Sequence, residues 1–213
     1  MDLKTKGLLF VISAPSGGGK DTVIKELFET DLPINKTISA TTRAIREEET
    51  DGVDYYFIDK EEFERRIQAN EFLEYTLYNG NYYGTLKQEV ERCISCGGYT
   101  ILKIEVEGAG NVRNLLPEAK TVFIVPPSME VLEQRLRTRG TETEESIQGR
   151  LATAREELKR ACEYDYIVVN DTVEECTRRI TEILNAESYR YSVMSDFVLG
   201  LRNINRKERI NYA

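Results

Sequence analysis

The stretch SAPSGGGKDT, residues 13–22, decides the fold of this chain of 213 residues. It follows the apolar run GLLFVIS at residues 7–13, which has the length and composition of a buried parallel strand. After the stretch, apolar residues recur at helical spacing from Val23 to Phe28. The order is therefore strand, glycine-rich loop and helix, the context in which a phosphate-binding loop works.

The loop has the chemistry to hold phosphate groups. Its glycines allow backbone N–H groups to turn inward around phosphate oxygens, and the N-terminus of the next helix adds about half a positive charge. Lys20 is placed to reach the β- and γ-phosphates as a point charge. We therefore expect the loop to bind ATP through Ser16, Gly17, Gly18, Gly19, Lys20, Asp21 and Thr22.

Asp21 is the unusual residue of this loop. Its position normally carries Ser or Thr, whose hydroxyl binds Mg²⁺, whereas here Thr22 comes one residue later. A carboxylate ~4 Å from a phosphate charge would be repelled by about 4 kcal/mol at an effective dielectric constant of about 20. We therefore expect Asp21 to meet a cation or to point away, and it is a candidate Mg²⁺ ligand, directly or through water.

The rest of the chain predicts an α/β fold. Buried-strand runs at residues 100–106, 121–125 and 166–169 are each followed by a helical pattern, which builds a parallel sheet covered on both faces. Short strand runs, a helix and the hairpin signal Asn79-Gly80-Asn81 predict a small α+β insertion. The expected division is a core of residues 1–33, 99–138 and 162–213, the insertion 34–98, and a helical segment 139–161.

The composition excludes several classes of function. A net charge of −8 argues against a nucleic-acid surface, and the absence of histidine excludes His-based triads and His metal sites. No apolar run approaches the ~20 residues of a membrane span, and no signal peptide is visible, so a cytoplasmic location is expected. Cys93 and Cys96 form a lone CxxC, more typical of reduced cysteines than of a redox or zinc site.

The end of the chain is the least informative part. Residues 187–213 have weak periodicity and late basic residues, and a helix, a dimer contact and a frayed tail all stay open. We expect a monomer or a homodimer.

The insertion carries a second group of polar residues suited to a nucleotide. Arg43 and Arg46 lie three residues apart and, with tyrosine hydroxyls, offer the donors of a phosphate clamp. Glu74 follows within an aromatic stretch. A buried Glu can select guanine, because its two oxygens accept from adjacent ring N–H and amino donors.

Taken together, these motifs resemble the guanylate kinase family over roughly residues 7–186. They are SAPSGGGK, SATTRAIR, DGVDYYF, EFLEY, GNYYGT, EVEGA, FIVPPS, RLRTRGTETEESIQGRL and YDYIVVND. The resemblance implies a P-loop kinase core, a GMP-binding domain in the insertion and a lid at residues 139–161. The implied reaction is ATP-dependent phosphorylation of GMP, and of dGMP, with Mg²⁺ as cofactor and no nucleic-acid or membrane partner.

The same resemblance implies roles for individual residues. The catalytic residues would be Lys20, Arg43, Arg139 and Arg150, and the ATP site would also include Arg135 and Asn170. The GMP site would comprise Ser39, Arg43, Arg46, Tyr55, Glu74, Tyr83, Thr85 and Glu105.

Four positions depart from the family pattern: Asp21, Glu48, Lys103 and Glu107. Glu48 stands where Gly is usual and Glu107 where Gln is usual. Lys103 stands where the strand normally carries an acid that serves the metal, next to the position of Asp21. We hypothesise that Asp21 and Lys103 have exchanged charges and form a salt bridge; two unrelated substitutions pointing apart are the equal alternative.

Two other functions stay open at this stage. A guanylate-kinase-like binding module would recognise GMP or a phosphorylated partner without turnover, but such modules typically lose the loop lysine and the lid arginines. A kinase for another nucleoside monophosphate is disfavoured because Glu74 and Ser39 match guanine. Because Asp21 and Lys103 depart from the family pattern, a binding module stays an alternative, and an enzyme of reduced activity is expected.

Overall fold

The computed structural model of the chain describes residues 7–78, 80–138 and 143–210. Its larger sheet, the core sheet, has five parallel strands in the order β2-β7-β1-β8-β9. Their bounds are Leu8–Ser13 (β1), Ile34–Lys36 (β2), Tyr99–Lys103 (β7), Lys120–Val125 (β8) and Tyr166–Val169 (β9). The predicted α/β fold with a parallel sheet is confirmed.

Both faces of the core sheet are covered, which explains the unbroken apolar run of β1. Phe10 and Ile12 pack on one side with helices α1 (Lys20–Phe28) and α7 (Val173–Ser188). Leu9 and Val11 pack on the other side with α3 (Lys87–Ser95) and α4 (Val106–Leu115). The carboxyl end of β1 therefore delivers the glycine-rich loop to the edge where β7 also ends.

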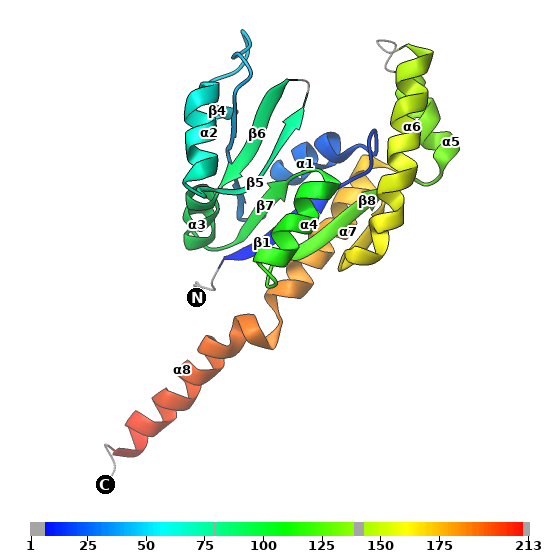
Figure 1. Cartoon of the computed structure of the whole chain (residues 1–213). Helices are drawn as coiled ribbons and strands as arrows, with labels where there is room; N and C mark the ends of the chain where they lie inside the picture. Colours follow the sequence, from blue (N-terminus) through cyan, green and yellow to red (C-terminus); the bar gives the residue numbers. More distant parts are fainter. Residues whose placement is uncertain (1–6, 79, 139–142, 211–213) are drawn as a thin grey trace.

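A second sheet, with the strand order β4-β3-β6-β5, stands beside the core sheet (Figure 1). Its strands are Ser39–Thr41 (β3), Tyr55–Phe57 (β4), Phe72–Tyr78 (β5) and Asn81–Leu86 (β6), and α2 spans Lys60–Gln68. Phe63 of α2 is fully buried there and stacks on Phe72 and Tyr82, with ring centroids 4.2 and 5.0 Å apart. The second sheet thus has an apolar core of its own.

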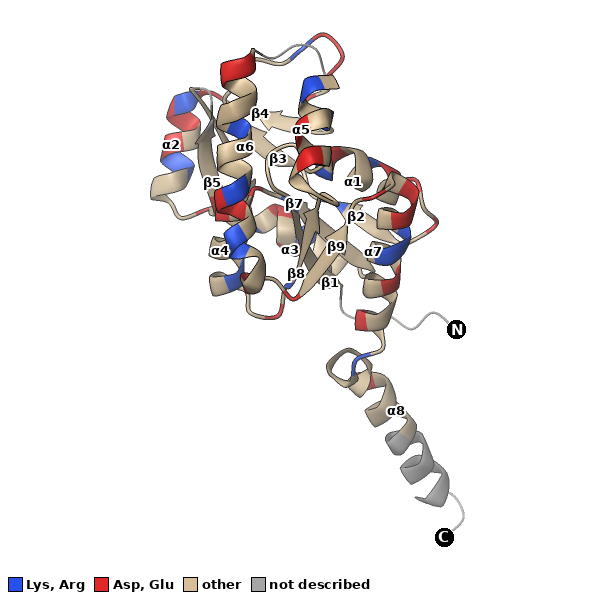
Figure 2. Cartoon of the chain, turned by 90° about the vertical axis from the view of Figure 1, so that its right-hand side faces the viewer, with Lys and Arg blue, Asp and Glu red and all other residues tan. Residues whose placement is uncertain are grey.

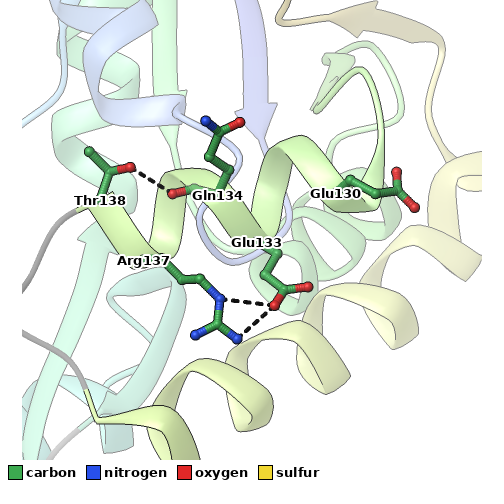
Figure 3. Close-up of a pocket in the computed structure, with 5 residues that line it drawn as sticks. All are labelled: Glu130, Glu133, Gln134, Arg137 and Thr138. Carbon is green, nitrogen blue, oxygen red and sulfur yellow. Dashed lines mark hydrogen bonds and ion pairs between the residues drawn. The ribbon is translucent and has the colours of Figure 1, made fainter.

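Helices α5 (Met129–Thr138) and α6 (Glu144–Leu158) form a pair on the side of the molecule away from the second sheet (Figure 1). The pair is held by an apolar cluster that includes Leu132, Leu136 and Leu151. Arg137 adds an ion pair to Glu144 at 2.5 Å and another to Glu133 at 2.7 Å. A shallow hollow lined by polar side chains lies along α5 beside this ion pair, at Glu130, Glu133, Gln134, Arg137 and Thr138 (Figure 3).

Some details differ from the sequence expectations. β2, at the start of the expected insertion, pairs with β7 and so lies in the core sheet. The expected strand 100–106 ends at Lys103, and α4 begins at Val106, so Glu105 becomes the residue that precedes the helix. The short β2 has too little pattern to be seen in the sequence.

The end of the chain is helical. Helix α8, Tyr191–Ile210, projects from the body beyond α7 (Figure 1). Within the described residues, no helix is long and apolar enough to cross a membrane.

Candidate functional site: a phosphate loop beside a buried carboxylate

The phosphate loop, residues 14–20, is shaped by glycine conformations and by packing. Gly17 and Gly19 have φ values of 84° and 89°, a region that L side chains rarely adopt. A Cβ on Gly17 would lie 2.8 Å from Leu136 and 3.0 Å from Leu132. The loop therefore needs glycine at position 17 both for its turn and for its close contact with α5.

Lys20 is buried at the start of α1, and its ammonium is directed at the end of β7. Its Nζ donates to Glu105 Oε1 at 2.6 Å and to the Ile104 carbonyl at 3.0 Å. The lysine side chain is 9% exposed, whereas that of Glu105 is 65% exposed. Glu105 therefore holds the lysine from the solvent side, next to the loop backbone.

Asp21 and Lys103 form the hypothesised salt bridge, with 3.0 Å between Lys103 Nζ and Asp21 Oδ1. The strand register explains the contact, because Lys103 pairs with Ile12 at the end of β1, just before the loop. Burial lowers the pKa of Lys103, but the charge and hydrogen bond of Asp21 outweigh it and leave the pKa raised. The alternative of two substitutions pointing apart is wrong.

Ser16, at the tip of the loop, contacts α6 through two of its own atoms. Its backbone N–H donates to Glu157 Oε2 at 2.8 Å, and its Oγ accepts from Arg150 Nε at 3.0 Å. Arg150 is a predicted residue, whereas Glu157 is not. No local sequence signal marks Glu157, because the adjacent Glu156 occupies the same turn of the same charged helix.

The back of the loop is supported by β9 and α5. Asn170 is buried, and its Nδ2 donates to the Gly18 carbonyl at 2.9 Å. Arg135 Nη2 donates to the carbonyls of Asn170 and Asp171, at 2.9 and 3.1 Å, while its buried Nη1 has no hydrogen-bond partner among the described residues. Of the other predicted ATP-site residues, Thr22 is exposed on α1, and Arg139 lies outside the described residues.

Glu74 is the buried carboxylate of the site. A β-bulge between Phe72 and Glu74 places it directly opposite Thr85 on β6, whose Oγ1 donates to Glu74 Oε1 at 2.7 Å. Its Oε2 faces α4, since a Cβ on Gly108 would lie 3.1 Å from it. Burial raises the pKa of Glu74; Lys20 acts in the opposite direction and Glu105 in the same direction. The carboxylate therefore lies within electrostatic reach of the phosphate loop.

The predicted phosphate clamp is assembled around Arg43. Its Nη2 pairs with Glu49 Oε1 at 2.6 Å, and this contact holds the pKa of Glu49 below its usual range. The guanidinium also lies 5.7 Å from the ring centroid of Tyr55, whose ring meets that of Tyr83 edge-on. Arg43, Tyr55 and Tyr83 are thus brought together.

The remaining predicted residues of the second sheet are less closely tied to this cluster. Arg46 is exposed, and only its backbone N–H joins the cluster, donating to Glu49 Oε2 at 2.9 Å. Ser39 is half-buried on β3, paired in register with Tyr55. Glu48 and Glu107 are exposed.

A metal ion would find few protein ligands here. Within the described ranges, no three Cys, Asp or Glu side chains form a metal cluster. Mg²⁺ usually needs only one or two carboxylates, because substrate phosphates and water complete its shell. The Asp21 carboxylate at the end of the loop fits that requirement, although Lys103 competes for its Oδ1.

Comparison with known proteins adds an independent finding. Residues 6–187 match the family model described as guanylate kinase. The guanylate kinase of Clostridioides difficile is 42% identical, with 91% of this chain and 95% of the relative covered. That of Caldanaerobacter subterraneus subsp. tengcongensis is 43% identical, with 95% and 98% covered. The crystal structure of guanylate kinase from Anaplasma phagocytophilum has 36% identity and a TM-score of 0.71, covering 90% of this chain and 92% of that one.

Proposed function

Because this chain belongs to the guanylate kinase family, we propose that it transfers the γ-phosphoryl group of ATP to the phosphate of GMP, giving ADP and GDP. One observation carries the choice of acceptor. Glu74 is a buried carboxylate of the second sheet that lies within electrostatic reach of Lys20. A base with adjacent ring N–H and amino donors satisfies such a group, and a base without them leaves it unpaired.

On the acceptor side, Glu74 reads guanine and Thr85 fixes its carboxylate from the opposite strand. Ser39 and Glu105 border the same space. Arg43, with Tyr55 and Tyr83, binds the GMP phosphate, and Arg46 joins them when the nucleotide is present. Arg43 then exchanges Glu49 for the GMP phosphate, which carries more negative charge than a carboxylate and can accept from the guanidinium through two oxygens.

On the donor side, the loop amides, Lys20 and the arginines of the α5/α6 pair bind and neutralise the triphosphate. Phosphoryl transfer needs positioning and charge neutralisation more than covalent chemistry by the protein. Lys20 is already desolvated beside the loop, so its charge acts in a medium of low dielectric constant. Arg135, Arg139, Arg150 and Asn170 complete the ATP site, and closure of residues 139–161 excludes water.

Mg²⁺ is the proposed cofactor, and it supplies Lewis-acid neutralisation of the phosphate oxygens. Asp21 is the residue that would hold it, directly or through water. Its salt bridge to Lys103 favours a second candidate, a binding module with weak or no turnover, because the pair opposes metal binding at the loop. The buried Lys20 favours the enzyme.

A coupled assay of ADP release tests the proposal. We expect turnover with ATP and GMP, lower turnover with dGMP, and at least about a hundredfold lower kcat/KM with AMP, CMP or UMP. A Mg²⁺ titration in the same assay reports how the metal is held. GMP binding without ADP release would support the binding module, and equal use of GMP, AMP, CMP and UMP would contradict the role of Glu74.

We also propose a cytoplasmic location and a monomeric or homodimeric state. All four cysteines are free, as in a reducing compartment. Sedimentation of the full chain measures the oligomeric state.

A further inference from the structure

Ser16 is the point where the phosphate loop and helix α6 are joined, and the two hydrogen bonds there differ in kind. Arg150 Nε donates to the neutral Ser16 hydroxyl at 3.0 Å, whereas the Ser16 backbone N–H donates to the carboxylate of Glu157 at 2.8 Å. Arg150 and Glu157 are two helical turns apart, so they share one face of α6. One helix face therefore reaches both the backbone and the side chain of a single loop residue.

Glu157 is not explained by local helix stability. It lies in the last turn of α6, where a negative charge opposes the helix dipole. It is half-buried, and burial raises the pKa of its carboxyl group while the Ser16 N–H acts in the opposite direction. Its neighbour Glu156 is exposed and simply pairs with Lys159 at 2.6 Å. Within the described part of the chain, Glu157 makes no ion pair, and Ser16 is its hydrogen-bonded partner.

We propose that Glu157 is a positioning residue for phosphoryl transfer, whose carboxylate keeps the Ser16 backbone joined to α6 while Arg150 exchanges the Ser16 hydroxyl for a phosphate. The inference rests on the proposed function. A phosphate oxygen is a charged acceptor and outcompetes a hydroxyl for a guanidinium. The Ser16 N–H already donates to a charged acceptor, so a phosphate offers it less than it offers Arg150. This amide therefore stays with Glu157 while the other loop amides bind the triphosphate. The Arg150 side chain then reorients while α6 stays attached to the loop, so its guanidinium remains directed at the loop.

Steady-state kinetics of the full chain test this inference by comparing an isosteric substitution of Glu157 with a truncation. Glu157→Gln keeps an amide oxygen that accepts from Ser16, whereas Glu157→Ala removes the acceptor. We expect Glu157→Ala to lower kcat about tenfold with a smaller change in KM for ATP, since the loss is one of alignment. Glu157→Gln should stay within about twofold of the parent. Glu156→Ala, one residue away on the same helix, is the matched control and should leave both constants unchanged.

Amide hydrogen exchange of the peptide that covers the phosphate loop gives a readout independent of turnover. Exchange should be faster in Glu157→Ala than in the parent, and close to the parent in Glu157→Gln. Parent kinetics with GMP decide the proposed function separately, and this exchange measurement still decides the inference if turnover is absent. Tighter ATP binding in both Glu157 variants would show that the carboxylate is only a stand-in for phosphate and would overturn the proposal. Parent-like kinetics and exchange in Glu157→Ala would overturn it as well.

Discussion

In the phosphate loop, the functional groups find their partners in distant parts of the chain, whereas in the second sheet they find them nearby. Ser16 bonds to Glu157, and Lys20 bonds to Glu105. By contrast, Arg43 pairs with Glu49, six residues away, and Thr85 bonds to Glu74, eleven residues away. The second sheet can therefore build its site from its own segment, while the loop depends on β7, β9 and α6 being in place.

This difference has a consequence for movement. Separate parts of the molecule meet at the loop, so we expect a ligand bound there to affect α6 through the contacts of Ser16. Figure 2 shows basic and acidic bands along α6, the helix whose Arg150 and Glu157 contact Ser16. Within the described residues, the contacts of Arg43 and Thr85 stay inside the second sheet's own segment, whereas Glu74 also faces α4.

Among substitutions in the phosphate loop, we expect Lys20→Ala to cause the largest loss of activity. We expect kcat to fall by about 10² to 10³, because a desolvated positive charge is lost where negative charge accumulates. Glu105 is then left without its partner. Steady-state ADP release measures the effect, and Lys25→Ala, on the exposed side of α1, is the control. Retention of more than about a tenth of the parent kcat would contradict the role of Lys20.

The corresponding change on the second sheet is Glu74→Gln. We expect kcat/KM for GMP to fall by about ten- to a hundredfold, because the amide offers a donor where guanine also offers one. Thr85 keeps an oxygen acceptor, so the strand pairing persists. The same assay with Glu61→Gln, an exposed substitution on α2, controls for the charge change. An unchanged preference for GMP over AMP would rule out guanine reading by this residue.

The Asp21–Lys103 pair tests the phosphate-loop side of the comparison further, and we expect its effect on kcat to be smaller. Asp21→Ser combined with Lys103→Asp should raise kcat a fewfold at limiting Mg²⁺, because a hydroxyl and a carboxylate then favour the metal. Stability should change by only about 1 kcal/mol, since the Asp21 side chain is 79% exposed and that of Lys103 is 46% exposed. The two single variants complete the double-mutant cycle. No gain in kcat from the double variant would count against the idea that the salt bridge opposes metal binding.

The smallest effect concerns the stability of the protein without nucleotide. The raised pKa of Glu74 means that the folded state binds this proton more tightly than the unfolded state. The resulting stabilisation is present below the ordinary pKa of 4.5 and is lost as pH rises through the raised value. Glu74→Gln should therefore raise the melting temperature at neutral pH by about one to a few degrees, and less at acidic pH. Thermal unfolding at two pH values measures this, and a lower Tm at neutral pH would contradict it.

Much of the fold was visible in the sequence because its signals are local. The apolar run of β1, the loop glycines and the hairpin at β5 and β6 each depend on neighbouring residues. The Asp21–Lys103 salt bridge was also predictable, since the ends of adjacent parallel strands meet at one edge of a sheet. The expected roles of the site residues stay predictions until the experiments above are done.

What the sequence concealed depends on tertiary placement. Glu157 reads as one more charge on a charged helix, and only the packing of α6 against the loop brings it to Ser16. The early start of α4 was missed because the strand pattern runs on into Ile104 and Val106, which are buried in the structure for other reasons. The bulge that aims Glu74 at Thr85 likewise has no signature of its own in the aromatic stretch.

Helix α8 makes the free end of the chain a natural handle. Its 20 residues extend away from the body and from the α5/α6 pair (Figure 1). At about 1.5 Å per residue, this is a spacer of about 30 Å. A dye, a bead or a solid support attached to α8 would stand clear of the phosphate loop and of the α5/α6 pair, so the protein could be tethered there for single-molecule recording.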